Sequence, residues 1–169
     1  YSNGAISADL DLDGDLDFVV NNIADEPFVY QNLDREQGNT RNSFLSFQLK
    51  GSPKNLNAIG ARVLIFKKTG ERQLEEFYPV RGYQSSAMAP LHIGIGDGSI
   101  VDSAFVIWPD QSYQRLHDLK FNQSNELTWR AGLPAFDFKK LLKKTANPFV
   151  FKDVTQKSGI NFTHHENPF

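Results

Sequence analysis

The stretch ARVLIFKKTGERQLEEFYPV, residues 61–80, consists of two apolar runs on either side of a short polar segment. Residues 61–66 and 73–80 are rich in the side chains that strands favour, and Gly70 lies in the KKTGE segment between them. Two such runs joined by a short turn with a glycine that can adopt a positive φ predict a β-hairpin. The stretch therefore assigns the middle of the chain to the all-β class.

More short strands are expected on both sides of this hairpin. Between residues 42 and about 130 the hydrophobic pattern repeats every second residue, which is the strand period. Segments rich in Gly, Pro, Asn, Asp and Ser separate the apolar runs at short intervals. This regular spacing indicates a sandwich-like or barrel-like domain. The other strands expected there are residues 44–49, 91–93, 104–108 and 126–129.

The two ends of the chain have a different character. Residues 18–20 and 28–30 are strand-like and follow an acidic loop, so we expect a loop that leads into a hairpin. Residues 33–42 have no apolar residue after Leu33 and are interpreted as a linker. Near the other end, residues 136–144 predict one or two helical turns, and residues 149–151 are strand-like. The expected division is therefore residues 1–41, 42–132 and 133–169.

Composition and charge exclude several classes of function. The 169 residues include no cysteine, so thiol catalysis, thiolate metal sites and disulfides are excluded. The net charge of −2 gives no overall field that would hold the chain on nucleic acid or on an anionic membrane. No apolar run approaches the ~20 residues of a membrane helix, so no membrane insertion is expected. With 40% hydrophobic residues and fourteen Phe, the chain can form a sizeable core.

The acidic loop DLDLDGDLDF, residues 9–18, has the spacing of a divalent-cation site. If Asp9 is position 1, carboxylates occupy positions 1, 3, 5, 7 and 9, and Gly14 is position 6. Oxygen ligands at 1, 3, 5 and 9, a sharp turn at 6 and a carbonyl ligand at 7 suit Ca²⁺, because Mg²⁺ tends to keep its waters. The predicted ligands are the side chains of Asp9, Asp11, Asp13 and Asp17 and the backbone carbonyl of Asp15.

Two other interpretations of the loop agree less well with its sequence. In the first, the Asp-rich turn is simply solvated and each side chain binds its own backbone, although solubility alone would not require strict alternation around one glycine. In the second, the loop is an EF-hand. That motif needs a bidentate Glu at position 12, where this chain has Val20, and it needs flanking helices instead of strand-like runs.

Two segments of the chain resemble known families. Residues 9–32, DLDLDGDLDFVVNNIADEPFVYQN, resemble the calcium loop and following strands of an FG-GAP (VCBS-type) repeat, which is a blade unit of β-propellers. The middle of the chain resembles the ASPIC/UnbV domain, which occurs beside such repeats in cartilage acidic protein-like and bacterial surface proteins. The motifs that carry this second resemblance are NAIGARV (57–63), RGYQSS (81–86), LHIGIG (91–96), VDSAFVIWPD (101–110) and NQ (122–123).

The chain departs from the second pattern in two places. Gln111 follows Trp108-Pro109-Asp110 where a glycine is expected, and Ser86 replaces a frequent Gln. Residues 151–167 resemble the segment that opens a further repeat array. Together the resemblances imply an all-β chain: partial propeller-blade strands with a Ca²⁺ loop, then a β-sandwich-like ASPIC/UnbV domain, then the start of another repeat.

The function implied is a non-catalytic, calcium-binding module at the cell surface or in the extracellular space. Its expected partners are proteins or carbohydrates, and unpaired strand edges predict self-association. Exposed aromatic residues beside turns are candidate ligand contacts, and the two best placed are Tyr83 and Tyr113. No catalytic arrangement can be inferred from the spacing of Ser, His and acidic residues. The alternative is an accessory domain of a larger secreted enzyme whose catalytic residues lie outside this chain.

Overall fold

The structure is a computed structural model that describes residues 1–38, 42–141, 152–163 and 165. It divides the chain into two compact units, Tyr1–Phe136 and Asp137–Phe169. The prediction of an all-β fold is confirmed: in the described ranges the only helical elements are short 3-10 turns. No helix of the described residues has the length and apolar character needed to cross a membrane.

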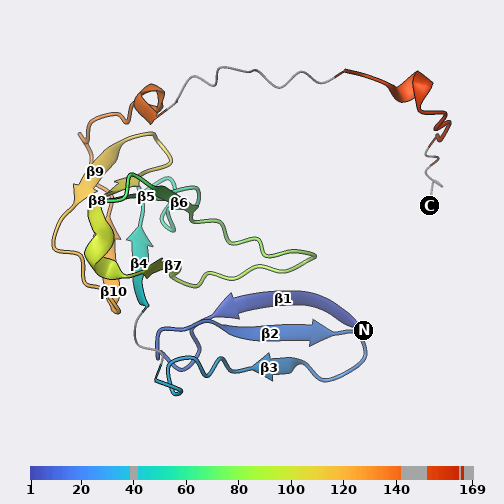
Figure 1. The fold of residues 1–169 in the computed structure, drawn as a ribbon, viewed down its shortest axis with the longest axis horizontal. Coiled ribbons are helices and arrows are strands. Elements are labelled where there is room, and N and C mark those ends of the chain that lie inside the picture. Colours follow the sequence, from blue (N-terminus) through green and yellow to red (C-terminus); the bar gives the residue numbers. More distant parts are fainter. Residues whose placement is uncertain (39–41, 142–151, 164, 166–169) are drawn as a thin grey trace. The chain divides into compact units, whose positions relative to one another are not determined.

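The first unit contains a sandwich of two sheets, which Figure 1 shows as separate layers. One sheet has four strands in the order β6-β5-β8-β9, all antiparallel. The other has the order β10-β4-β7, in which β10 and β4 run parallel. The strands are β4 (Ser43–Lys50), β5 (Arg62–Lys67), β6 (Arg72–Glu76), β7 (Leu91–Gly96), β8 (Val101–Ile107), β9 (Tyr113–Leu116) and β10 (Ser124–Thr128).

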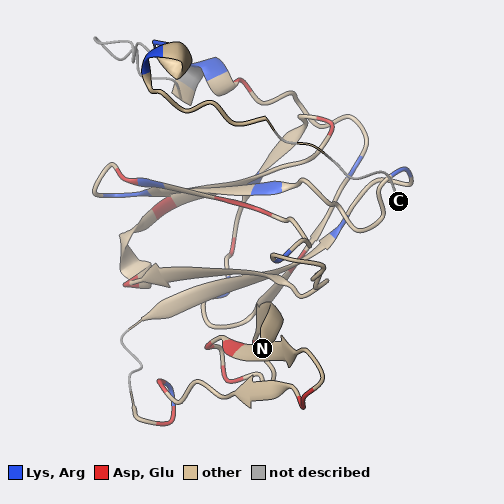
Figure 2. Ribbon diagram, turned by 90° about the vertical axis from the view of Figure 1, so that its right-hand side faces the viewer, with Lys and Arg blue, Asp and Glu red and all other residues tan. Residues whose placement is uncertain are grey.

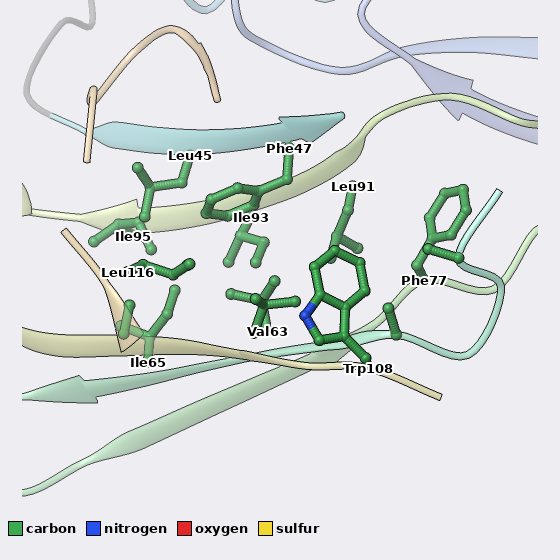
Figure 3. Close-up of a cluster of buried hydrophobic side chains, with 14 residues drawn as sticks. Leu45, Phe47, Val63, Ile65, Phe77, Leu91, Ile93, Ile95, Trp108 and Leu116 are labelled. Carbon is green, nitrogen blue, oxygen red and sulfur yellow. The ribbon is translucent and has the colours of Figure 1, made fainter. Parts of the chain in front are cut away.

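Alternate residues of these strands form one hydrophobic core between the two sheets. Figure 3 shows side chains of β4 and β7 facing side chains of β5 and β9, with the indole of Trp108 beside Val63. Trp108 is 1% exposed and belongs to the core. Burial of each large side chain stabilises the fold by about 1.5–3 kcal/mol. Fully or almost fully buried members are Leu45, Phe47, Val63, Ile65, Ile93, Val106 and Trp108.

The hairpin predicted from residues 61–80 is formed by β5 and β6, with Val63 paired to Glu75. Gly70 has a φ of +85°, and its amide donates to the carbonyl of Lys67 across the turn. The second strand was predicted to reach residue 80, but β6 ends at Glu76. Beyond it the Phe77 side chain enters the core, and Pro79 has no amide hydrogen to continue the ladder.

A separate three-stranded antiparallel sheet lies at the N-terminus, in the order β1-β2-β3. Its strands are β1 (Ser2–Ala8), β2 (Asp17–Asn22) and β3 (Phe28–Tyr30). The hairpin expected from residues 18–20 and 28–30 is confirmed by the pairing of Phe18 with Tyr30. Neither β1 nor β9 was predicted, because SNGAISA and YQRL contain few apolar residues and lack a clear period of two.

The described part of the second unit contains two 3-10 turns, Phe138–Leu141 and Thr155–Lys157. The first falls within the helical turns predicted for residues 136–144, and residues 142–144 lie outside the described ranges. The strand expected at residues 149–151 also lies outside them.

Candidate functional site

The acidic loop connects β1 to β2, and the pairing of these strands sets its shape. Ala8 pairs with Asp17, so the two ends of the loop lie side by side. Gly14 has a φ of +97° and Leu12 a φ of +66°. A left-handed backbone is costly for a leucine, by roughly 1–3 kcal/mol, so the surrounding contacts must impose it. Within the loop, the amide of Asp15 donates to Asp13 Oδ1 at 2.9 Å.

The loop brings carboxylates together in two overlapping groups. Asp9, Asp11 and Asp13 offer oxygens that all lie within 4.8 Å of one another, and so do Asp13, Asp15 and Glu36. Figure 2 shows red acidic segments of the ribbon close to the N-terminal strands. Asp13 belongs to both groups and joins them into one acidic cluster.

Three oxygens of this cluster are shielded from solvent and have no hydrogen-bond partner among the described residues: Asp9 Oδ1, Asp13 Oδ2 and Asp15 Oδ1. A buried carboxylate oxygen without a partner is unfavourable, because the group has lost its hydration. Several carboxylate oxygens that face one another are the donor set that Ca²⁺ prefers. The residues present therefore fit a hard divalent cation.

Asp17 has a different environment from the other four aspartates. Its side chain is 2% exposed, and neither of the two groups of close oxygens includes it. Asp17 Oδ2 accepts the amide of Leu10 at 3.0 Å, and Oδ1 accepts the amide of Asn32 at 2.8 Å. In this arrangement Asp17 ties the start of the loop to the residues that follow β3. Asp15, whose carbonyl was the predicted ligand, contributes its side chain to the cluster.

The structure adds residues to the site that the sequence analysis missed. Gln31 Nε2 donates to Asp11 Oδ2 at 2.8 Å and to Glu36 Oε1 at 3.0 Å. The amide of Arg35 donates to Asp15 Oδ2 at 3.1 Å. Residues 33–38, interpreted as linker, therefore close one side of the loop. The hairpin predicted from residues 18–20 and 28–30 is the sequence signal for this closure. Its pairing of Phe18 with Tyr30 places the residues after β3 beside those before β2.

Burial raises the pKa of the Asp15 carboxyl above its ordinary value. The hydrogen bond from the Arg35 amide acts in the opposite direction, and the nearby charges of Asp13, Asp17 and Asp11 raise the pKa further. Like charges and desolvation both disfavour the ionised form. A bound divalent cation would reverse this balance, because its charge favours ionised ligands.

Phe44, at the start of β4, connects the loop to the sandwich. A Cβ built on Gly14 would lie 2.1 Å from Phe44 Cε1, so only a glycine fits against the ring. The guanidinium of Arg35 lies 5.5 Å from the centre of the same ring. The ring of His92 stacks on it at 4.7 Å, and burial lowers the pKa of His92. The loop is thus packed against the sandwich through one aromatic side chain.

The two tyrosines predicted as ligand contacts lie on different elements. Tyr83 is 67% exposed and lies in the loop that follows β6. Tyr113 lies on β9, partly buried between Phe105 at 6.1 Å and Phe136 at 5.2 Å. Tyr113 therefore belongs to a row of packed aromatic rings, whereas Tyr83 presents its ring to solvent.

The motif around Trp108 forms a tight turn between β8 and β9. The amide of Gln111 donates to the carbonyl of Trp108 at 2.9 Å, and Gln111 has a φ of +67°. This conformation explains why a glycine is expected at position 111. Burial would raise the pKa of Asp110, but hydrogen bonds from Ser112 and from Trp129 Nε1, the latter at 2.9 Å, hold it below its ordinary value.

This turn and six of the seven sandwich strands, β5 to β10, lie in a segment that matches a known family. Residues 51–133 match the family model described as ASPIC and UnbV. The ASPIC/UnbV match covers just under half of the chain, and β4 and the acidic loop precede it. The resemblance of the middle of the chain to this domain is confirmed. No curated protein matches the chain.

Proposed function

We propose that this chain is a non-catalytic, calcium-binding module of an extracellular or cell-surface protein, and that it contacts protein or carbohydrate partners. In this proposal the N-terminal strands are part of an FG-GAP (VCBS-type) repeat that precedes the ASPIC/UnbV domain. The observation that carries the proposal is the set of unpartnered, shielded oxygens of Asp9, Asp13 and Asp15.

The ion has a structural role in this proposal. Asp9, Asp11, Asp13 and Asp15 would hold it, and it would neutralise carboxylates that otherwise repel one another. Because the loop packs on Phe44, the ion would also fix the loop against the sandwich. A ligand bound only by the folded state stabilises it by RT ln(1 + [L]/Kd), about 2.7 kcal/mol at one hundred times Kd. Extracellular calcium is millimolar, which suits even a weak site.

Calorimetric titration of Ca²⁺ into the chelator-treated protein tests the proposal. We expect heat of binding and a rise in melting temperature, with a smaller response to Mg²⁺. Asp11→Ala should abolish both, because it removes a carboxylate from the cluster without disturbing a buried side chain.

Asp25→Ala is the matched control. It removes the same charge from the exposed turn between β2 and β3, outside both groups of close oxygens. This variant should bind Ca²⁺ as the unaltered protein does. The absence of any heat or stabilisation up to millimolar Ca²⁺ would refute the proposal.

A further inference from the structure

A cavity of about 520 Å³ lies in the first unit and is lined by the end of β1 and the acidic loop, by the outer face of the β10-β4-β7 sheet, by the end of β6, and by residues within the segment 81–92. Its floor includes a cross-strand row of polar residues, because Ser46 of β4 pairs with Ser124 on one side and His92 on the other. Gln48 adds a side chain one step along the same face of β4. This volume is in the range of small-molecule sites, roughly 300–1,000 Å³.

Three polar side chains of the cavity lining have no partner within the described part of the chain. Gln48, Glu75 and Gln123 line the cavity, and none of them makes a side-chain hydrogen bond or ion pair with another described residue. Glu75 is the most informative of these. It lies on the edge strand β6 opposite the core residue Val63, so its side chain is on the inner face of its own sheet, and it lines the cavity in a half-buried position. A partly desolvated carboxylate without a partner is ready to accept hydrogen bonds from a ligand.

The charges around the cavity select the class of ligand. Arg81 lines it, but its Nη1 already donates to the carbonyls of Tyr78 and Val80. The acidic residues Asp9 and Glu75 also line it, so an anionic ligand would be repelled. The other polar groups of the lining are amides and hydroxyls, which both donate to and accept from hydroxyl groups, the imidazole of His92, and the carboxylates of Glu75 and Glu76, which accept only.

Aliphatic side chains complete the lining and can cover the C–H faces of a sugar ring. They come from the acidic loop and from the segment before β7, and they include Leu12, Leu16, Ala89 and Pro90. We propose that this cavity binds a neutral saccharide of roughly one or two rings, with Gln48 and Glu75 as its principal hydrogen-bonding residues. This inference rests on the proposed function, which includes carbohydrates among the partners, and it adds the site at which a carbohydrate binds.

The cavity shares a wall with the acidic cluster. Asp9 belongs to both, and Leu12 of the same loop also lines the cavity. A cation that orders the loop would therefore also order one wall of the cavity, and the two binding events would be coupled. Saccharide contacts through Gln48 and Glu75 do not themselves require the ion.

The test is calorimetric and saturation-transfer NMR titration of the protein with a panel of neutral sugars: N-acetylglucosamine, maltose, cellobiose and lactose. We expect millimolar or tighter binding of at least one sugar. Gln48→Ala and Glu75→Gln should each weaken it tenfold or more at an unchanged melting temperature. Glu71→Gln, the same change in the exposed β5–β6 turn, is the control and should leave the affinity unaltered.

Three outcomes would overturn the inference. It is wrong if none of the four sugars binds, if binding survives both variants unchanged, or if spermidine binds the cavity and the sugars do not. Titrations in Ca²⁺ and in chelator separate this inference from the calcium proposal. If a sugar binds and Ca²⁺ has no effect, only the calcium proposal is refuted. If the protein responds to Ca²⁺ and no sugar binds, only the saccharide site is refuted.

Discussion

Gly14 packs against the ring of Phe44 so closely that a Cβ on the glycine would lie 2.1 Å from Cε1 of that ring. The turn of the acidic loop is therefore in contact with the first strand of the sandwich, although 30 positions separate the two residues in the chain. The position of Gly14 requires a glycine for two reasons: its backbone has a left-handed φ of +97°, and the ring of Phe44 leaves no room for a side chain.

Gly14→Ala is expected to destabilise the protein by roughly 2–5 kcal/mol, because backbone strain and a clash with Phe44 add together. Chemical denaturation measures this free energy of unfolding. Gly70→Ala is the matched control, since Gly70 also has a positive φ but has open space around it. Gly70→Ala should lose only the stability that backbone strain costs. The double variant Gly14→Ala/Phe44→Leu should recover part of the stability lost in Gly14→Ala, because the smaller side chain relieves the clash. Equal effects at Gly14 and Gly70 would contradict this account.

Asp17→Asn should destabilise the protein by about 1.5–3 kcal/mol even in the presence of chelator. The buried carboxylate accepts two backbone amides, and an asparagine side chain offers only one acceptor oxygen for them. Thermal and urea denaturation without metal measure the effect. Asp11→Asn, at an exposed position of the same loop, should change stability mainly when Ca²⁺ is present. Full metal-free stability of the Asp17 variant would show that these hydrogen bonds contribute little.

The protein should become less stable as the pH decreases, because His92 takes up a proton more readily in the unfolded chain than in the folded one. Burial lowers the pKa of His92 below 6.5, so between that lowered pKa and 6.5 the unfolded chain binds more protons than the folded one. The free energy of unfolding therefore decreases as the pH drops through this window. Denaturation from about pH 7.5 to 5.5 should show a weaker pH dependence for His92→Gln. His117→Gln, at an exposed position just after β9, should behave like the unaltered protein.

The free edge of β3 should allow two copies of the chain to associate. β3 pairs only with β2 among the described residues, and its three side chains are all exposed, Val29 at 63%. An exposed apolar edge strand is a template for pairing with another chain, and a lysine on the edge opposes it. Light scattering at high concentration should detect a dimer that Val29→Lys abolishes. Val154→Lys, outside any strand, should dimerise normally; a strictly monomeric unaltered protein would reject the prediction.

The sequence predicted the sandwich strands because their pattern is local. In β7, buried Leu91 and Ile93 alternate with the less buried His92, and between β5 and β6 the turn at Gly70 fixes which strand follows. β9 was missed because YQRL shows no alternation, and its position depends on pairing with β8. The carboxylates of the acidic loop were found from spacing alone, since a short loop needs few outside contacts to bring its own side chains together.

The sequence by itself determined the all-β class, the hairpin at residues 61–80 and the acidic residues of the loop, because periodicity, turn glycines and short spacing act between near neighbours. Only the tertiary structure decided that Asp17 binds backbone amides, that Glu36 and Gln31 join the cluster, and that Glu75 lines a cavity. The physical reason is that these contacts depend on strand register and on the packing of separate sheets. Both are set by interactions between residues far apart in the chain, and no local pattern records them.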